Sequence, residues 1–288
     1  MSVTQQDLID DVRRELHSWP TVGAKLSSLV LITGNTLTLQ ESFFRDFCVP
    51  GGLIEIGNEV MLIVNLPKDT SSILVLRGYM GTTAAAHSTV DDVLIHNKGH
   101  WSNHEIKRFI NDAIAWLHPH SWTQGTSDTF TINANAFDAA LPSGTGISSP
   151  AGNQICRLQY RDSASRWHSI YGWEFIGGRI RIKSTPGGLT TFRLLYLLFE
   201  DALTSLTDAL ANELFREAIY KYAASLAFDG LKNNRARYLD YAASLNDRAS
   251  TPDELTRVVY DIRNKANLAR DEHSMPTPAG FISTFEEP

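Results

Sequence analysis

The chain has 288 residues, of which 43% are hydrophobic and 20% charged, so its composition is that of a folded globular protein and excludes wholesale disorder. Its formal net charge of -6 argues against a broad basic surface of the kind that grips nucleic acid. Two distant cysteines, Cys48 and Cys156, exclude a disulfide scaffold and a four-cysteine zinc site. The polar, acidic start is unlike a signal peptide, and no apolar run is long enough to span a bilayer. We therefore expect a soluble protein of a reducing compartment.

Residues 1–20 predict a helix. Thr4 is the expected N-cap, Asp7 stands three residues later, and Pro20 is incompatible with continuation of the helix. Residues 21–100 then change to short β-rich runs, among them Leu29 to Ile32, separated by turn residues. This pattern predicts a small antiparallel β module, folded as a barrel or a sandwich.

Residues 101–120 carry the clearest helix start in the chain. Ser102 is the expected N-cap with Glu105 at the third helical position, a capping box, and Trp101 can pack onto the first turn. Asn111 lies on or beside the apolar stripe of this helix, so its amide either has a partner or is exposed.

The remaining chain predicts a second β module at 121–206, inserted between helices, and helices over 207–270 that begin at Thr207. Residues 271–288, rich in proline, predict an extended tail. The fold class is therefore α+β: a helical framework with two small antiparallel β modules, a barrel or sandwich each, and a loose C-terminal tail.

The sequence contains none of the common catalytic, metal or phosphate-binding motifs, so we expect no enzyme, no cofactor and no metal site. The His100 and His104 pair lacks further ligands and favours a capping or solvated role. The dense aromatic residues of the second β module fit a small core, or alternatively a sugar-stacking platform. They are Tyr160, Trp167, Tyr171, Trp173 and Phe175.

The segment 77–87 runs from an apolar strand into Arg-Gly, Gly-Thr, small residues and a histidine. Its glycines permit a tight reversal, and its threonine hydroxyls can satisfy turn amides. With the hairpin 54–63 it resembles a pattern of tailed-bacteriophage virion proteins, in which "I-G-x-E-x-M" precedes "V-x-R-G-x-x-G-T-x-A-x-x-H". The chain departs where Val90 and Asp91 replace the usual glycine. The matching residues are Gly57, Glu59, Met61, Arg77, Gly78, Gly81, Thr82, Ala84 and His87.

A second stretch, 101–113, resembles the capped helix of phage head-to-tail connector (adaptor, neck) proteins, "W-[ST]-x-x-E-[LI]-x-x-x-[IL]-N-x-A". The residues that match are Trp101, Ser102, Glu105, Ile106, Ile110, Asn111 and Ala113. Together the two resemblances cover about a third of the chain, and neither includes the second β module.

These resemblances imply a structural virion protein of the neck, assembled in the host cytoplasm. They imply a homo-oligomeric ring, commonly of twelve copies, that docks under the portal protein, meets a downstream neck or tail protein and lets DNA pass without specific binding. The tail residues Phe281, Ile282 and Phe285 would anchor it to the portal or to a neighbouring copy. A tail or baseplate protein is the main alternative, and a carbohydrate-binding protein that uses Trp167 and Trp173 is a further one.

Overall fold

The computed structural model describes residues 2–68, 72–118, 120–131, 138–140, 155–176, 179–182, 191–244 and 251–274. Helices and antiparallel sheets are both present, which confirms the α+β class. The chain divides into two compact units. The first combines Met1–Trp116 with Ala202–Glu272, and the second is built mainly from the intervening segment Leu117–Asp201. The predicted tail anchors Phe281, Ile282 and Phe285 lie outside the described residues.

Helix α1 (Gln5–Leu16) opens the first unit with the predicted cap. The Thr4 hydroxyl accepts from the backbone N–H of Asp7 at 3.3 Å, and the Asp7 carboxylate accepts from the Thr4 N–H at 2.8 Å. The helix ends at Leu16, ahead of Pro20, with His17 in the left-handed region at φ 46°.

Six strands form the sheet of the first unit, in the antiparallel order β1-β6-β3-β4-β5-β2. They are β1 (Thr21–Lys25), β2 (Thr36–Thr38), β3 (Leu53–Ile56), β4 (Glu59–Asn65), β5 (Ser72–Leu76) and β6 (Asp92–His96). The predicted hairpin around Gly57 and Asn58 joins β3 to β4. Alternate side chains of these strands, with Phe44 from a short 3-10 helix η1 (Ser42–Phe47), fill one hydrophobic core.

The sheet curls until its edge strands β1 and β2 meet, but only through a bridge between Leu26 and Leu39. Strand pairing among the described residues therefore does not close the predicted barrel. The strand expected at Leu29 to Ile32 is also wrong, because only Val30 makes a bridge, to His87. The backbone carbonyl of Leu31 instead accepts from the Arg77 guanidinium.

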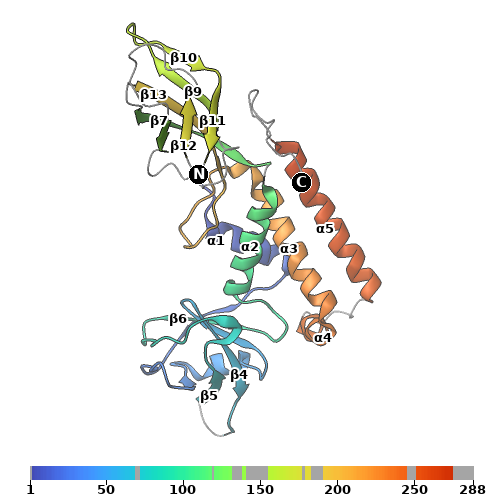
Figure 1. Cartoon of the computed structure of the whole chain (residues 1–288). Helices are drawn as coiled ribbons and strands as arrows, with labels where there is room; N and C mark the ends of the chain where they lie inside the picture. The colour runs from blue at the N-terminus through green and yellow to red at the C-terminus, as the bar shows by residue number, and fades with distance from the viewer. Residues whose placement is uncertain are drawn as a thin grey trace. The chain divides into compact units, whose positions relative to one another are not determined.

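The helices of the first unit are α2 (Asn103–Leu117), α3 (Arg216–Asn233), α4 (Arg235–Ser244) and α5 (Pro252–His273). Figure 1 shows them together with α1. Aromatic rings join α2 to α3: Trp116 stacks on Tyr222 at 4.1 Å between centroids, and Trp101 meets Phe228 edge-on at 6.3 Å. An ion pair of 2.7 Å between Arg263 and Asp229 joins α5 to α3. Among the described helices, none has both the length and the apolar character needed to cross a bilayer.

The helix predicted to begin at Thr207 instead begins at Arg216, after a 3-10 turn, η4 (Glu213–Phe215). The preceding backbone is held by other partners: the Asp208 carboxylate accepts from the N–H groups of Thr204 and Ser205, both at 2.8 Å. Pairing of residues 206–210 with the start of α1 uses further backbone groups. These long-range bonds override the local helical pattern. At the other end, α5 continues to His273, so the predicted tail begins later than residue 271.

The second unit holds two sheets, with strand orders β10-β9-β13-β7 and β11-β12-β8. Its strands are β7 (Trp122–Thr131), β8 (Asp138–Ala140), β9 (Ile155–Arg161), β10 (Trp167–Ile170), β11 (Trp173–Ile176), β12 (Arg179–Ile182) and β13 (Thr191–Phe199). Strand β8 is short, with three residues that pair with β12. Both sheets contribute to one hydrophobic cluster, which includes Leu158, Ile180 and Phe192, so this β module has a core of its own.

Candidate assembly site

The segment 77–87, which follows β5 and is called the corner motif below, is organised by one buried carboxylate, Glu59, at the start of β4. The Arg77 guanidinium donates to it twice, from Nε to Oε1 and from Nη2 to Oε2, each at 2.7 Å. The backbone N–H groups of Gly78 and Ala85 donate at 3.0 and 2.9 Å, and His87 Nε2 donates at 2.8 Å. The Glu59 side chain has no exposed surface. Five donors thus surround an anion that has no contact with water.

These donors set the protonation state of Glu59. Burial by itself would raise its pKa, but the hydrogen bonds from Arg77, Ala85, His87 and Gly78 together lower it to about 2. The carboxylate is therefore ionised at neutral pH. Arg77 continues beyond it to the carbonyls of Leu31 and Gly34, at 3.0 and 2.6 Å, so one side chain holds two loops in place.

The glycines of the motif serve the backbone path. Gly78 has φ +59°, and a Cβ there would lie 2.9 Å from the Thr82 carbonyl oxygen. Gly81 has φ +79°, and Met80 between them is also left-handed at φ 57°. The Thr82 hydroxyl accepts from the N–H of Val60 at 3.1 Å and donates to the Tyr79 carbonyl at 2.8 Å. The predicted corner residues Arg77, Gly78, Gly81, Thr82 and His87 therefore act in one place.

Glu59, the centre of this network, was not predicted as a site residue. The available signal was an acid in the middle of an apolar strand pattern, directly after the tight turn. Such a position demands a partner, since an unpaired buried charge is strongly destabilising.

A second buried carboxylate, Glu55 on β3, binds the N-terminus of α2. It accepts from the first two helical N–H groups, those of Asn103 at 2.8 Å and His104 at 3.1 Å, and from His96 Nε2 at 3.1 Å. The next N–H, of Glu105, goes to the Ser102 hydroxyl at 3.2 Å. The helix start is thus satisfied by its own cap and by a strand distant in sequence.

Glu105 completes the capping box by accepting from the Ser102 N–H at 3.1 Å, and it also binds Arg237 of α4 at 2.8 Å. Arg237 reaches back to the Gly99 and His100 carbonyls. The backbone before α2 and the backbone of α4 approach closely here, since a Cβ on Gly99 would lie 2.5 Å from the backbone nitrogen of Tyr241. Trp101, predicted to pack on the helix, is buried. The Arg237 guanidinium lies over its ring, 5.4 Å from the ring centre.

Asn111 has the partner that its position demanded. Its Nδ2 donates to the Leu203 carbonyl at 3.1 Å, and its Oδ1 accepts from the Leu203 N–H at 2.9 Å. Gln5 of α1 donates to the same carbonyl at 2.7 Å. The side chain of Asn111 therefore pairs with the backbone that enters the C-terminal helices.

His100 is a buried structural residue. It bonds the Ser18 hydroxyl through Nδ1 at 2.9 Å and the Ser244 hydroxyl through Nε2 at 2.6 Å. Burial, followed by repulsion from His96, Arg13 and Arg237, lowers its pKa to about 4. Within the described residues, no three His, Cys, Asp or Glu side chains are arranged to hold a metal ion.

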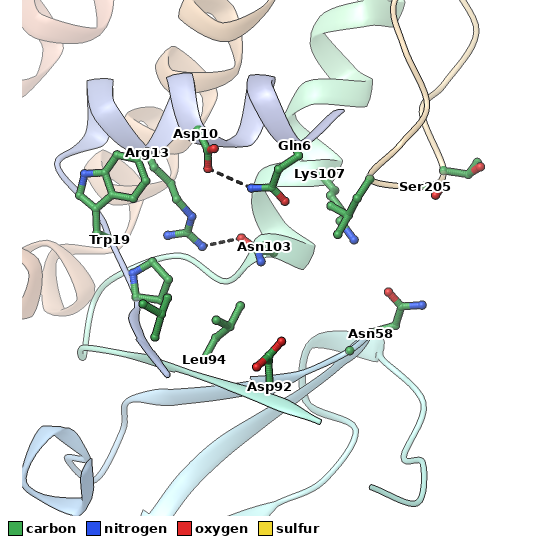
Figure 2. Close-up of a pocket in the computed structure, with 15 residues that line it drawn as sticks. Gln6, Asp10, Arg13, Trp19, Asn58, Asp92, Leu94, Asn103, Lys107 and Ser205 are labelled. Carbon is green, nitrogen blue, oxygen red and sulfur yellow. Dashed lines mark hydrogen bonds between the residues drawn. The ribbon is translucent and has the colours of Figure 1, made fainter. Parts of the chain in front are cut away.

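A groove of about 840 Å³ lies beside these networks. Figure 2 shows α1 and α2 on one side of it and β6 on the other. Arg13 bonds Asn103 at 2.6 Å across its wall, whereas Lys107 has no charged partner among the described residues. Trp19 and Val22, which also line the groove, are 51% and 64% exposed. The groove therefore offers apolar surface next to an available cation.

The aromatic residues of the second unit do not form a single platform. Trp173 and Tyr160 pack against the hydrophobic cluster. The Arg193 guanidinium lies over the Trp167 ring at 4.2 Å, and Tyr171 is 90% exposed. The side chain of Phe175 is not among those described.

The family comparison matches residues 82–263 to the model described as SU10 adaptor protein. This match spans more than half of the chain and includes α2, α3 and the segment Leu117–Asp201 that carries the strands of the second unit. The chain belongs to the SU10 adaptor protein family. It is thus a phage adaptor protein, in agreement with the resemblance at the α2 cap. No curated protein matches this adaptor.

Replacing Glu59 of the adaptor with glutamine is expected to lower the free energy of unfolding at pH 7 by about 3–5 kcal/mol, because the buried Arg77 charge loses its partner. The ordinary pKa of this carboxyl is 4.5 and the folded one about 2. Its stabilisation is therefore complete above pH 4.5 and is lost as the pH falls towards 2. Denaturant unfolding at pH 7, 4 and 3 measures both effects. The exposed control Glu41→Gln should change neither, and an unaltered pH profile in E59Q contradicts the assignment.

Gly99→Ala is expected to destabilise the fold by more than about 2 kcal/mol, since the new Cβ would overlap the α4 backbone and φ is +86°. The matched control is Gly57→Ala, which also has positive φ, +59°, but has no atom within 4 Å of the added Cβ. Its cost should stay near 1 kcal/mol. Equal shifts in the urea midpoint of the two variants would show that the close approach to α4 is unimportant.

Asn111→Ala should cost about 1–3 kcal/mol, because the Leu203 N–H loses its acceptor and the Leu203 carbonyl loses one of its two donors, keeping Gln5. Thermal unfolding of this variant, compared with the exposed control Asn97→Ala, measures the effect. Similar midpoints for the two variants would contradict a stabilising role for the hydrogen bonds between Asn111 and Leu203.

Proposed function

We propose that this phage adaptor is the head-to-tail connector of the virion neck: a ring of copies, commonly twelve, that docks under the portal protein and extends the DNA channel. The family match over residues 82–263 carries the proposal. On this view the protein is structural and has no catalytic activity, and its further partner is the neck or tail protein below.

The buried ionic networks support a structural role. Glu59 and Glu55 each fix several backbone segments, so the relative positions of the curled sheet and α2 are tightly specified. A subunit of a closed ring needs such a fixed shape, because heterologous interfaces close only at one rotation angle. The groups with strongly shifted pKa values also favour this role. Both Glu59 and His100 are buried and occupied by structural hydrogen bonds, so neither is placed to act on a substrate.

The groove of the first unit is a suitable contact surface for a partner. Trp19 and Val22 are exposed in it, and exposed aromatic surface next to polar groups is typical of protein interfaces. The net charge of -6 supports a channel that DNA can traverse without sticking, with acidic or neutral residues at the lumen.

Mass measurement of the purified adaptor with and without portal tests the proposal. We expect a ring on the portal, whose mass gives the number of copies. A low-resolution image of the virion with the protein in the tail or baseplate, together with no portal complex, would support the main alternative instead.

Removing residues 275–288 should abolish portal attachment in reconstitution while leaving the described helices intact, since α5 ends at His273. The finer variant replaces Phe281, Ile282 and Phe285 with alanine. Its matched control replaces Ser283 and Thr284 in the same segment. Undiminished attachment of the triple variant contradicts a docking role for the tail.

A further inference from the structure

The groove of the first unit has two chemically different ends, and all the residues that line it belong to that unit. Figure 2 shows Trp19 at one end and Lys107 with Ser205 at the other. Trp19 is followed in the chain by Pro20 and Val22, which line the groove too. A surface whose apolar and cationic parts are separated fits a chain segment whose side chains change from apolar to acidic along its length.

Two cations line the groove, and neither forms an ion pair with a residue that the structure describes. Arg13 is only 2% exposed and donates to a backbone carbonyl and to the Asn103 side-chain oxygen. Burial lowers the pKa of Arg13 to about 10, and attraction to Glu55 and Asp10 opposes this shift. Lys107, on α2, is half-buried. An anion entering the groove would therefore gain from both charges.

Two acids also line the groove, and both have partners. Asp92 is held by Lys25 of β1, whose Nζ lies 2.6 Å from its carboxylate. Asp10 accepts from Gln6 Nε2 at 2.9 Å. The two acids and two bases of the lining cancel in formal charge, and the bound Lys25 adds one positive charge beside them. The favourable place for an anion is therefore the Lys107 end, and not the groove as a whole.

The segment 275–288, which lies outside the described residues and is called the tail segment below, has the matching order of side chains. Its large apolar residues come first, and Glu286 and Glu287 follow them directly, with no basic residue anywhere in the segment. Aromatic rings can pack on the exposed Trp19 ring, and carboxylates can pair with Lys107. The apolar anchors of the tail segment are Phe281, Ile282 and Phe285.

The tail segment can reach the groove of its own chain. The Arg270 guanidinium of α5 lies 4.8 Å from the centre of the Trp116 ring, so α5 ends beside the end of α2, within the first unit. Lys107 precedes Trp116 by nine residues on α2, about 14 Å along the helix. The part 275–285 can extend over about 36 Å. The segment is thus long enough without help from another copy.

We propose that the tail segment binds in the groove of its own chain, with its apolar anchors at the Trp19 end and its two glutamates at the Lys107 end. Binding within one chain is favoured over binding between copies, because a short tether raises the effective concentration to about the millimolar range. The contact itself does not require the connector role. Its consequence rests on that role: the anchors proposed to dock on the portal stay covered until a portal competes for them.

Photocross-linking of the full-length protein, with benzoylphenylalanine in place of Phe285 and no portal present, tests the contact. We expect cross-linked peptides that contain Trp19 or Val22, in a product with the mass of one chain. A product with the mass of two chains would show that a neighbouring copy supplies the segment, and it would overturn the assignment to one chain. Absence of groove peptides from the products would overturn the contact altogether. This measurement changes no residue of the groove.

Fluorescence anisotropy of a labelled peptide of residues 277–288 measures whether the groove is occupied. The full-length variant F281A/I282A/F285A, whose groove is freed, should bind the peptide at least tenfold more tightly than the wild type. Adding Trp19→Ala and Lys107→Glu should remove this gain. The matched control adds Tyr260→Ala and Lys265→Glu, an exposed aromatic residue and an exposed lysine of α5, and should keep it.

Equal peptide affinity of the wild type and the triple variant, or equal loss from the groove and control substitutions, overturns the proposal. An unchanged thermal midpoint of W19A/K107E shows that lost binding is not lost folding. Neither experiment contains portal, so this contact can fail while portal docking succeeds, and the reverse.

Discussion

The buried Glu59 carboxylate is the constraint on which the curled sheet of the first unit depends. An anion without water must be matched by donors, and here they come from Arg77, Gly78, Ala85 and His87, all in the corner that follows β5. Satisfying that charge fixes the corner in one conformation. It also orders the loop before β2 through the second set of bonds from Arg77. Hydrophobic burial alone would not select this conformation, because it has no direction.

Glu55 extends the same principle from the sheet to the helices. Its carboxylate occupies the N-terminus of α2, where free N–H groups and the helix dipole favour an anion. Glu105, bound to Arg237, then connects α2 to α4. Two acids on neighbouring elements thus join strand, helix cap and C-terminal helices. The first unit is therefore held together as one body, which suits the structural role of a phage adaptor protein.

The exposed surfaces have a different character from this interior. The groove near Trp19 combines apolar area with the Lys107 cation, whereas in the second unit the Arg161 and Arg193 guanidiniums lie over the Trp167 ring. Membership of the SU10 adaptor protein family gives these surfaces a common context, contact with other phage structural proteins.

Local chemistry determined the parts that the sequence could predict: the Thr4 and Ser102 caps, the Gly57-Asn58 hairpin, and the two β modules. Their signals lie within a few residues, so one sequence suffices. Tertiary structure alone decided what the polar residues bind. Nothing adjacent to Glu55 indicates that it caps a helix 48 residues later, nor does the helical pattern after Thr207 reveal that Asn111 and α1 hold that backbone. Such partners are chosen by long-range packing, because a buried charge or amide takes whichever donors the fold brings to it.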